Sequence, residues 1–198
     1  MTQEEVIKQF VAYGYATDAL KFARFDCDQL SRIVNTESME WLSIVTSLVT
    51  HYSRPFKMAK RMAPLESSFV SADHFALHQR LLLARDKAHA HLDGDLAAIP
   101  DGSALHQIRL VKQADGKHFW CPSRVLLFEP VDIPSIASLI ESLLARLNKE
   151  TDVLETLILP SVTPLPAGLY LLSPVSPFFT RDRRHDGIDT LEDLGPIH

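Results

Sequence analysis

The sequence has few of the marks of a secreted or membrane-bound protein. Its 198 residues include two cysteines, Cys27 and Cys121, which lie far apart and form no CxxC pair. The two could form a disulfide, but a chain of this length can bury a sizeable core without one, so we expect a reducing compartment. The start of the chain, Met1–Glu5, is polar and acidic and lacks the apolar segment of a signal peptide. Apolar runs such as Leu81–Ala84 fall far short of the roughly 20 residues that cross a bilayer, so we predict a cytoplasmic protein without membrane contact.

Motifs for nucleotide-driven and serine-hydrolase chemistry are missing as well. The sequence contains no GxxxxGK[ST] phosphate-binding loop, no GxGxxG dinucleotide motif and no GxSxG nucleophile turn. Neither class of function therefore has support in this chain. The formal net charge of −5 also excludes a global polycation, so any contact with nucleic acid must come from a local basic patch.

The spacing of the apolar residues predicts a mainly all-α protein. Helical periodicity covers residues 4–24, as one helix or two short ones, then 27–34, 39–52, 73–91 and 133–159. Thr36–Ser38 supplies an N-cap for the helix over 39–52, and Pro55 ends it. Ser71–Asp73 offers an N-cap to the helix that follows, and Asp93–Asp95 is its stop signal.

Two segments depart from this helical pattern. Residues 106–111 alternate polar and apolar side chains, Asp115-Gly116 is a strong turn signal, and the chain from Phe119 onward is compatible with a strand. Together they predict a small β-hairpin over 106–128, inserted between helices. Half of the twelve prolines lie at or beyond Pro160, so we expect an extended or partly disordered tail. The predicted organisation is thus one helical domain over 1–159, including the hairpin, and a Pro-rich extended tail over 160–198.

Three histidines and an arginine share one side of the predicted helix over 73–92. On an ideal helix they fall within about 60° of one another. They are His74, His78, Arg85 and His89, and Leu81, Leu82 and Leu92 lie on the same side. The opposite side carries Gln79, Arg80, Asp86 and Lys87. Burying a guanidinium and imidazoles among leucines is unfavourable unless they are paired or functional, so this segment is the strongest candidate for chemistry.

The segment Arg85-Asp86-Lys87-Ala88-His89-Ala90-His91, followed by Asp93, resembles the RxxxxxH signature of HEPN-domain proteins. It is most similar to the abortive-infection and toxin branch of that superfamily. The resemblance implies a helical bundle that forms a homodimer, in which two copies of the motif meet as a ribonuclease site without metal or cofactor. It also implies a role in phage defence, RNA processing or a toxin–antitoxin system, with an antitoxin or operon partner. By resemblance Arg85 clamps the phosphate, His91 is the acid/base, and Asp86 orients one of them.

Helical phase leaves the partner of Arg85 open. Arg85 and His91 lie about 120° apart on a straight helix, whereas Arg85 and His89 share a face. Three arrangements account for this difference: the helix is distorted or ends near His91, the partner subunit completes the geometry, or His89 is the working histidine.

A second cluster of polar and basic residues follows the helix over 39–52. The cluster comprises His51 and Arg54, followed by Lys57, Lys60 and Arg61. If this helix packs beside the motif helix, His51 and Arg54 would join the pocket and, with His89, bind the substrate. Otherwise these residues form a solvated helix end whose cations complement the helix dipole.

Three functional hypotheses follow from these residues. The first is a metal-independent endoribonuclease that uses Arg85, Asp86 and His91. The second is a non-catalytic HEPN-like module that dimerises and binds a protein or nucleic acid, which is favoured if Arg85 and His91 are buried and fully paired within one subunit. The third is a metal-binding protein, which requires His74, His78 and a further histidine to converge, although the HExxH motif is absent.

Overall fold

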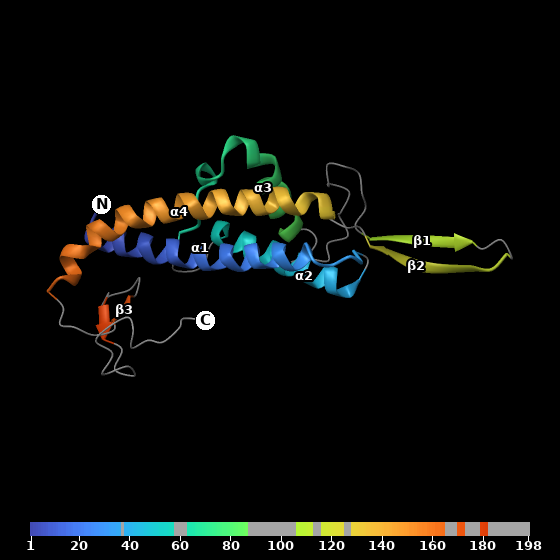
Figure 1. Cartoon of the computed structure of the whole chain (residues 1–198), viewed down its shortest axis with the longest axis horizontal. Helices are drawn as coiled ribbons and strands as arrows, with labels where there is room; N and C mark the ends of the chain where they lie inside the picture. The colour runs from blue at the N-terminus through green and yellow to red at the C-terminus, as the bar shows by residue number, and fades with distance from the viewer. Residues whose placement is uncertain are drawn as a thin grey trace. The chain divides into compact units, whose positions relative to one another are not determined.

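The computed structural model describes residues 1–36, 38–57, 63–86, 106–112, 116–124, 128–164, 170–172 and 179–181. Over these ranges the chain is mainly helical, which confirms the predicted class (Figure 1). The helices are α1 (Gln3–Leu30), α2 (Met39–Ser53), α3 (Phe75–Ala84) and α4 (Ile133–Val162). Within the described ranges no helix has the length and apolar character needed to span a membrane.

Helix α1 is longer and less interrupted than its sequence pattern predicts. The pattern separated a helix ending near Arg24 from a short one over 27–34, but α1 runs unbroken to Leu30. Buried apolar side chains continue through this region, including Cys27, which is a free thiol. An ion pair between Arg24 and Asp28, one turn apart at 2.5 Å, spans the predicted break. Burial raises the pKa of the Cys27 thiol to about 12, which keeps it uncharged.

Helix α2 confirms the prediction at both ends. The Ser38 side chain accepts a hydrogen bond from the Trp41 backbone N–H at 3.1 Å, as an N-cap does. At the other end the α-helix stops at Ser53 and passes into a 3-10 turn over Arg54–Phe56, where Pro55 cannot continue the hydrogen-bond ladder. The stripe buried between these ends comprises Trp41, Val45, Leu48, Val49 and Tyr52.

Helix α3 begins later than predicted. A 3-10 turn over Ala72–His74 precedes it, and the Ser71 hydroxyl lies 3.0 Å from His74 Nδ1 instead of capping a backbone N–H. The α-helix ends at Ala84, after which Arg85 and Asp86 continue in a π-helical turn. The motif therefore begins where the regular α-helical phase ends.

Helix α4 follows a 3-10 turn over Pro130–Asp132. It was predicted to end near Leu159, but it includes Pro160 and ends at Val162. Proline removes one backbone donor, and so close to the helix end this affects a single turn. The predicted start at Ile133 is correct.

The contacts of the chain define two compact units, and both α1 and α4 contribute to each of them. The first unit contains Met1–Asp18, Pro55–Phe69 and Leu144–His198, and its buried residues include Ile7, Tyr13, Leu65, Leu147 and Leu154. The second unit contains Ala19–Arg54 and Val70–Leu143. Its fully buried side chains include Leu20, Leu48, Leu81, Phe128, Ile136, Leu139 and Ile140. The predicted site residues His51, Arg54, Arg85 and Asp86 belong to this second unit.

Two antiparallel strand pairs complete the described chain. Strands β1 (His106–Lys112) and β2 (His118–Arg124) pair from His106 opposite Arg124 to Lys112 opposite His118. Gly116 in the intervening turn has a φ of 84°, a backbone conformation that glycine adopts without strain. In the segment expected to be an extended tail, β3 (Tyr170–Leu172) pairs with β4 (Phe179–Arg181), and the sequence pattern did not indicate this pairing.

Candidate functional site

Arg85 and Asp86 form an ion pair at the C-terminal end of α3. A terminal guanidinium nitrogen of Arg85 donates to Asp86 Oδ1 at 2.9 Å, and the Arg85 side chain is 39% exposed. The sequence placed Asp86 on the opposite, solvated side of an ideal helix, whereas in the structure the two consecutive residues lie in a π-helical turn and are paired. Because a guanidinium has five N–H donors, this pair leaves Arg85 able to bind an anion from solvent.

His89 and His91 lie outside the described residues. The predicted pairing of Arg85 with His91, and the alternative in which His89 is the working histidine, therefore remain predictions. The described part of the motif consists of Arg85 and Asp86. The guanidinium of Arg85 in this part is accessible to solvent. A buried and fully paired arginine would instead favour the non-catalytic module.

His51 contacts α1, not α3. Its Nδ1 lies 2.8 Å from Oδ2 of Asp26 and 3.3 Å from the Ser47 hydroxyl. Its ring also packs against Phe22, with centroids 5.4 Å apart and planes inclined by 34°. An imidazole held by a carboxylate at one nitrogen can donate or accept a proton at the other. Sequence reasoning missed Asp26, because a carboxylate in a stretch that also contains the charged residues Lys21, Arg24 and Asp28 gives no signal that it is the one to be buried.

Arg54 is exposed where α2 gives way to its 3-10 turn. Among the described residues no hydrogen bond or ion pair joins Arg54 or His51 to Arg85. The reason is the phase of α2: Tyr52 points to α3, and His51, one residue earlier and about 100° away, points to α1. The structure thus associates His51 and Arg54 with the α1 side of α2, apart from the Arg85–Asp86 pair.

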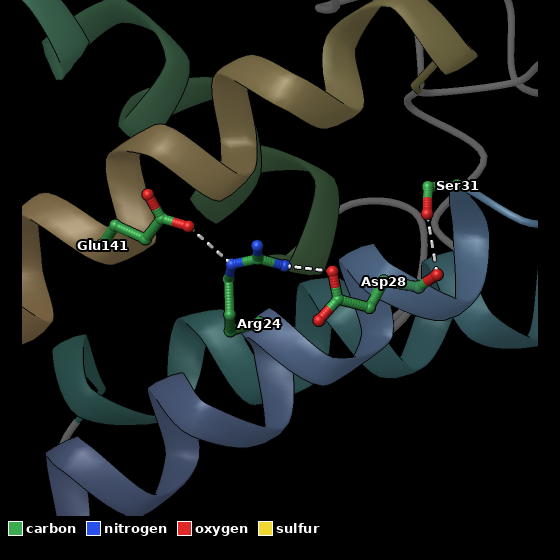
Figure 2. Close-up of polar contacts among 4 residues, drawn as sticks. All are labelled: Arg24, Asp28, Ser31 and Glu141. Atoms are coloured by element: carbon green, nitrogen blue, oxygen red, sulfur yellow. Dashed lines mark hydrogen bonds and ion pairs between the residues drawn. The ribbon is translucent and has the colours of Figure 1, made fainter.

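The remaining arginines on these helices of the second unit are engaged by carboxylates. Figure 2 shows Arg24 between Asp28 and Glu141 of α4. The Nε of Arg24 lies 2.8 Å from Oε1 of Glu141. The two carboxylates raise the pKa of Arg24. Arg80 binds both oxygens of Asp132, at 3.0 and 3.2 Å, and lies over the Phe128 ring. Each of these two guanidinium groups makes two bonds to carboxylate oxygens, whereas within the described ranges Arg85 makes one such bond and Arg54 makes none. Arg54 and Arg85 therefore remain the candidates for binding an anion.

His78 belongs to the core. It is 1% exposed, and its Nδ1 lies 2.8 Å from the Tyr52 hydroxyl. Burial lowers the pKa of His78 and raises the pKa of Tyr52, so both groups are neutral near pH 7. His74 lies in the preceding 3-10 turn, and the part of the chain that the structure describes contains no cluster of three or more side chains suited to a metal ion.

The buried imidazole of His78 should make the protein less stable in acid. Its folded pKa is lowered, so below the unfolded value of about 6.5 the unfolded chain binds a proton that the folded chain does not. The free energy of unfolding therefore falls with falling pH, by at most about 1.4 kcal/mol per pH unit for one proton. Urea titrations at pH 7.5 and at pH 5.5 measure how much the free energy of unfolding falls between the two pH values. This decrease should be larger for the wild type than for His78→Gln, whose side chain keeps a polar partner for Tyr52 but does not titrate. Equal losses in the two proteins would contradict this role of His78.

Comparison with protein-family models, with curated proteins and with solved structures finds no match to this chain. A function for it must therefore rest on the chemistry of its own residues, of which the Arg85–Asp86 pair and the half-buried His51 held by Asp26 are two candidates.

Proposed function

We propose that this chain is a metal-independent endoribonuclease of HEPN type, with a HEPN-like helical bundle, the hairpin over 106–128 as an insertion, and a homodimeric active site. The proposal carries with it a cytoplasmic role in phage defence or a toxin–antitoxin system, with an antitoxin or operon partner. The observation that supports it most is the half-exposed guanidinium of Arg85, held by Asp86 at the end of α3. A π-helical turn at this position is a further support, since such turns occur frequently at functional sites.

The chemistry needs few protein groups because RNA carries its own nucleophile, the 2′-hydroxyl. In the proposed reaction this hydroxyl attacks the adjacent phosphorus, the bond to the 5′-oxygen breaks, and a 2′,3′-cyclic phosphate forms. His91, by its place in the motif, removes the hydroxyl proton or protonates the leaving oxygen, which is typically worth ~10²–10⁴ in rate. Arg85 binds the phosphoryl oxygens and offsets the negative charge that develops there, while Asp86 fixes the guanidinium.

A second candidate is the non-catalytic module that binds a protein or nucleic-acid partner. The ion pair of Arg85 with its neighbour Asp86 is compatible with this candidate as well, because such a pair is also an ordinary feature of a helix end. In that case Arg85 would contribute to binding without a change in the bonds of the partner.

The decisive experiment is an RNA-cleavage assay in EDTA with untagged protein and several single-stranded RNA substrates. We expect cleavage that leaves 2′,3′-cyclic phosphate ends and that stops when the nucleotide 5′ to the cut is replaced by its 2′-deoxy form. The control substrate is the same oligonucleotide with its 2′-deoxy nucleotide at a position away from the cut, and this substrate should still be cleaved. Intact RNA after incubation with folded protein, for all substrates, would contradict the proposal and favour the binding module.

A further inference from the structure

Helix α1 exposes two phenyl rings in the second unit. Phe22 is 57% exposed and Phe25 is 58% exposed. Residues three apart are neighbours on a helix surface, so the rings lie next to each other. Single exposed apolar residues need no explanation, but a pair of aromatic rings beside further functional groups indicates a binding surface.

The imidazole of His51 extends this aromatic surface from α1 to α2. Its ring packs against Phe22 at 5.4 Å, and Asp26 and Ser47 both contact its Nδ1. These contacts hold the ring in one orientation. Over the described residues Nε2 makes no hydrogen bond, and the side chain is 23% exposed, so this nitrogen is available to a ligand.

Two cations that form no ion pair with a carboxylate within the described ranges border the rings. Lys21 lies four residues before Phe25 on α1, and Arg54, the first residue of the 3-10 turn that follows α2, lies three residues after His51. Each is therefore a surface neighbour of the ring it flanks. Both are exposed, and neither forms an ion pair within the described ranges. Arg24 differs in this respect, because Asp28 and Glu141 hold its guanidinium (Figure 2).

We propose that these five residues bind single-stranded RNA, and we call them the aromatic strip: Lys21, Phe22, Phe25, His51 and Arg54. Bases stack on the phenyl rings, the His51 Nε2 hydrogen-bonds to a base or phosphate, and the two cations contact the backbone on either side. The inference rests on the proposed function for its choice of RNA and adds where the strand is held. Binding to the strip is nevertheless measured independently of cleavage.

The chemistry of the strip favours an unpaired strand over a duplex or a second copy of the chain. Only unstacked bases present their π-faces to side chains, and base–aromatic stacking is the usual way in which proteins hold such strands. Two cations on a chain of net charge −5 are few for binding a duplex through its phosphates. Two phenyl rings bury at most about 500 Å² on this chain, below the roughly 600 Å² that each partner contributes to the smallest stable protein interfaces.

The test measures the anisotropy of a labelled single-stranded 2′-O-methyl RNA, which binds like RNA but cannot be cut at its 2′-position. The double variant Phe22→Ala/Phe25→Ala should weaken binding by at least ~10-fold, because stacking on each ring contributes roughly 5- to 150-fold. Phe22→Leu keeps much of the apolar volume without the π-face and should also weaken binding. Lys21→Ala and Arg54→Ala should each lower the slope of log affinity against log salt by about 0.7.

Matched controls are available on the same chain. Phe75→Ala removes a phenyl ring that is 44% exposed on α3, and Lys149→Ala removes an exposed lysine on α4. Both should bind within twofold of the wild type. Since the substituted side chains of the strip are exposed, circular dichroism should show that every variant folds.

The outcomes separate this inference from the proposed function. If the wild type binds RNA through the aromatic strip but leaves ordinary RNA intact in EDTA, the ribonuclease proposal is wrong and the proposed RNA-binding role of the strip is supported. If the wild type cuts RNA but the strip variants bind RNA as tightly as the controls do, the proposed RNA-binding role of the strip is wrong and the ribonuclease proposal is supported. A change of oligomeric state in the double variant, with unchanged RNA affinity, would identify the surface as a protein contact and overturn the inference.

Discussion

Arg85→Ala is expected to lower the rate of RNA cleavage in EDTA by at least ~100-fold, since removing one group that stabilises transition-state charge typically has an effect of this size. Arg85→Lys keeps the charge but loses the two-pronged geometry, so it should recover only part of the rate. His91→Ala should have an effect similar to that of Arg85→Ala. The double variant should be little worse than either single one, because residues that act as a unit are not additive.

The matched control for this series is Arg80→Ala. Arg80 lies on α3 five residues before Arg85, but Asp132 holds it at 3.0 Å, so it stabilises the fold without a part in the proposed reaction. Its removal should leave the cleavage rate within a few-fold of the wild type. Equal losses for Arg80→Ala and Arg85→Ala, in variants whose unfolding curves match, would show that Arg85 has no special role.

Trp41→Ala is expected to reduce the free energy of unfolding by about 3–5 kcal/mol, a large part of the roughly 5–15 kcal/mol of a typical domain. Trp41 is 1% exposed in the core of the second unit, so the truncation leaves a cavity. Its indole N–H has no hydrogen-bond partner in the described part of the chain, and a buried donor without an acceptor destabilises the folded state by about 1–3 kcal/mol. Trp41→Phe removes that donor and keeps an aromatic ring, so it should cost less than about 1.5 kcal/mol.

Urea unfolding followed by far-UV circular dichroism measures both variants without dependence on tryptophan fluorescence. Met39→Ala is the control, because Met39 is an exposed apolar residue at the start of the same helix and should change stability by less than about 0.5 kcal/mol. A loss for Trp41→Phe as large as that for Trp41→Ala would mean that the indole N–H makes a bond that the phenyl ring cannot replace.

Local patterns predicted the parts of the fold that depend on local interactions. The Ser38 cap, the buried stripe of α2 and the start of α4 are all determined by residues within a few positions of one another, and the structure agrees with each. The continuity of α1 past Arg24 was missed because tertiary packing of Cys27 and Leu30 outweighs a weak local signal.

The candidate sites were less predictable, because they depend on the choice of neighbours. His51 and Tyr52 are consecutive, yet one contacts Asp26 of α1 and the other contacts His78 of α3. The sequence spacing predicted that the two side chains point in different directions from α2. It could not predict that α1 lies on the side of His51 and α3 on the side of Tyr52. The contact between Arg85 and Asp86 was among the arrangements considered from the sequence, because the two residues are consecutive, but the π-helical turn in which they lie was not predicted.

The two long helices have a consequence for how this protein unfolds. Residues of α1 up to Asp18 belong to the first unit and those from Ala19 to the second, and α4 is likewise divided between Leu143 and Leu144. Neither unit can be excised without cutting both helices in mid-course, where the ladder of backbone hydrogen bonds is continuous. Loss of order in one unit would fray the same helices in the other, so the melting of the two should be cooperative although each has its own buried residues.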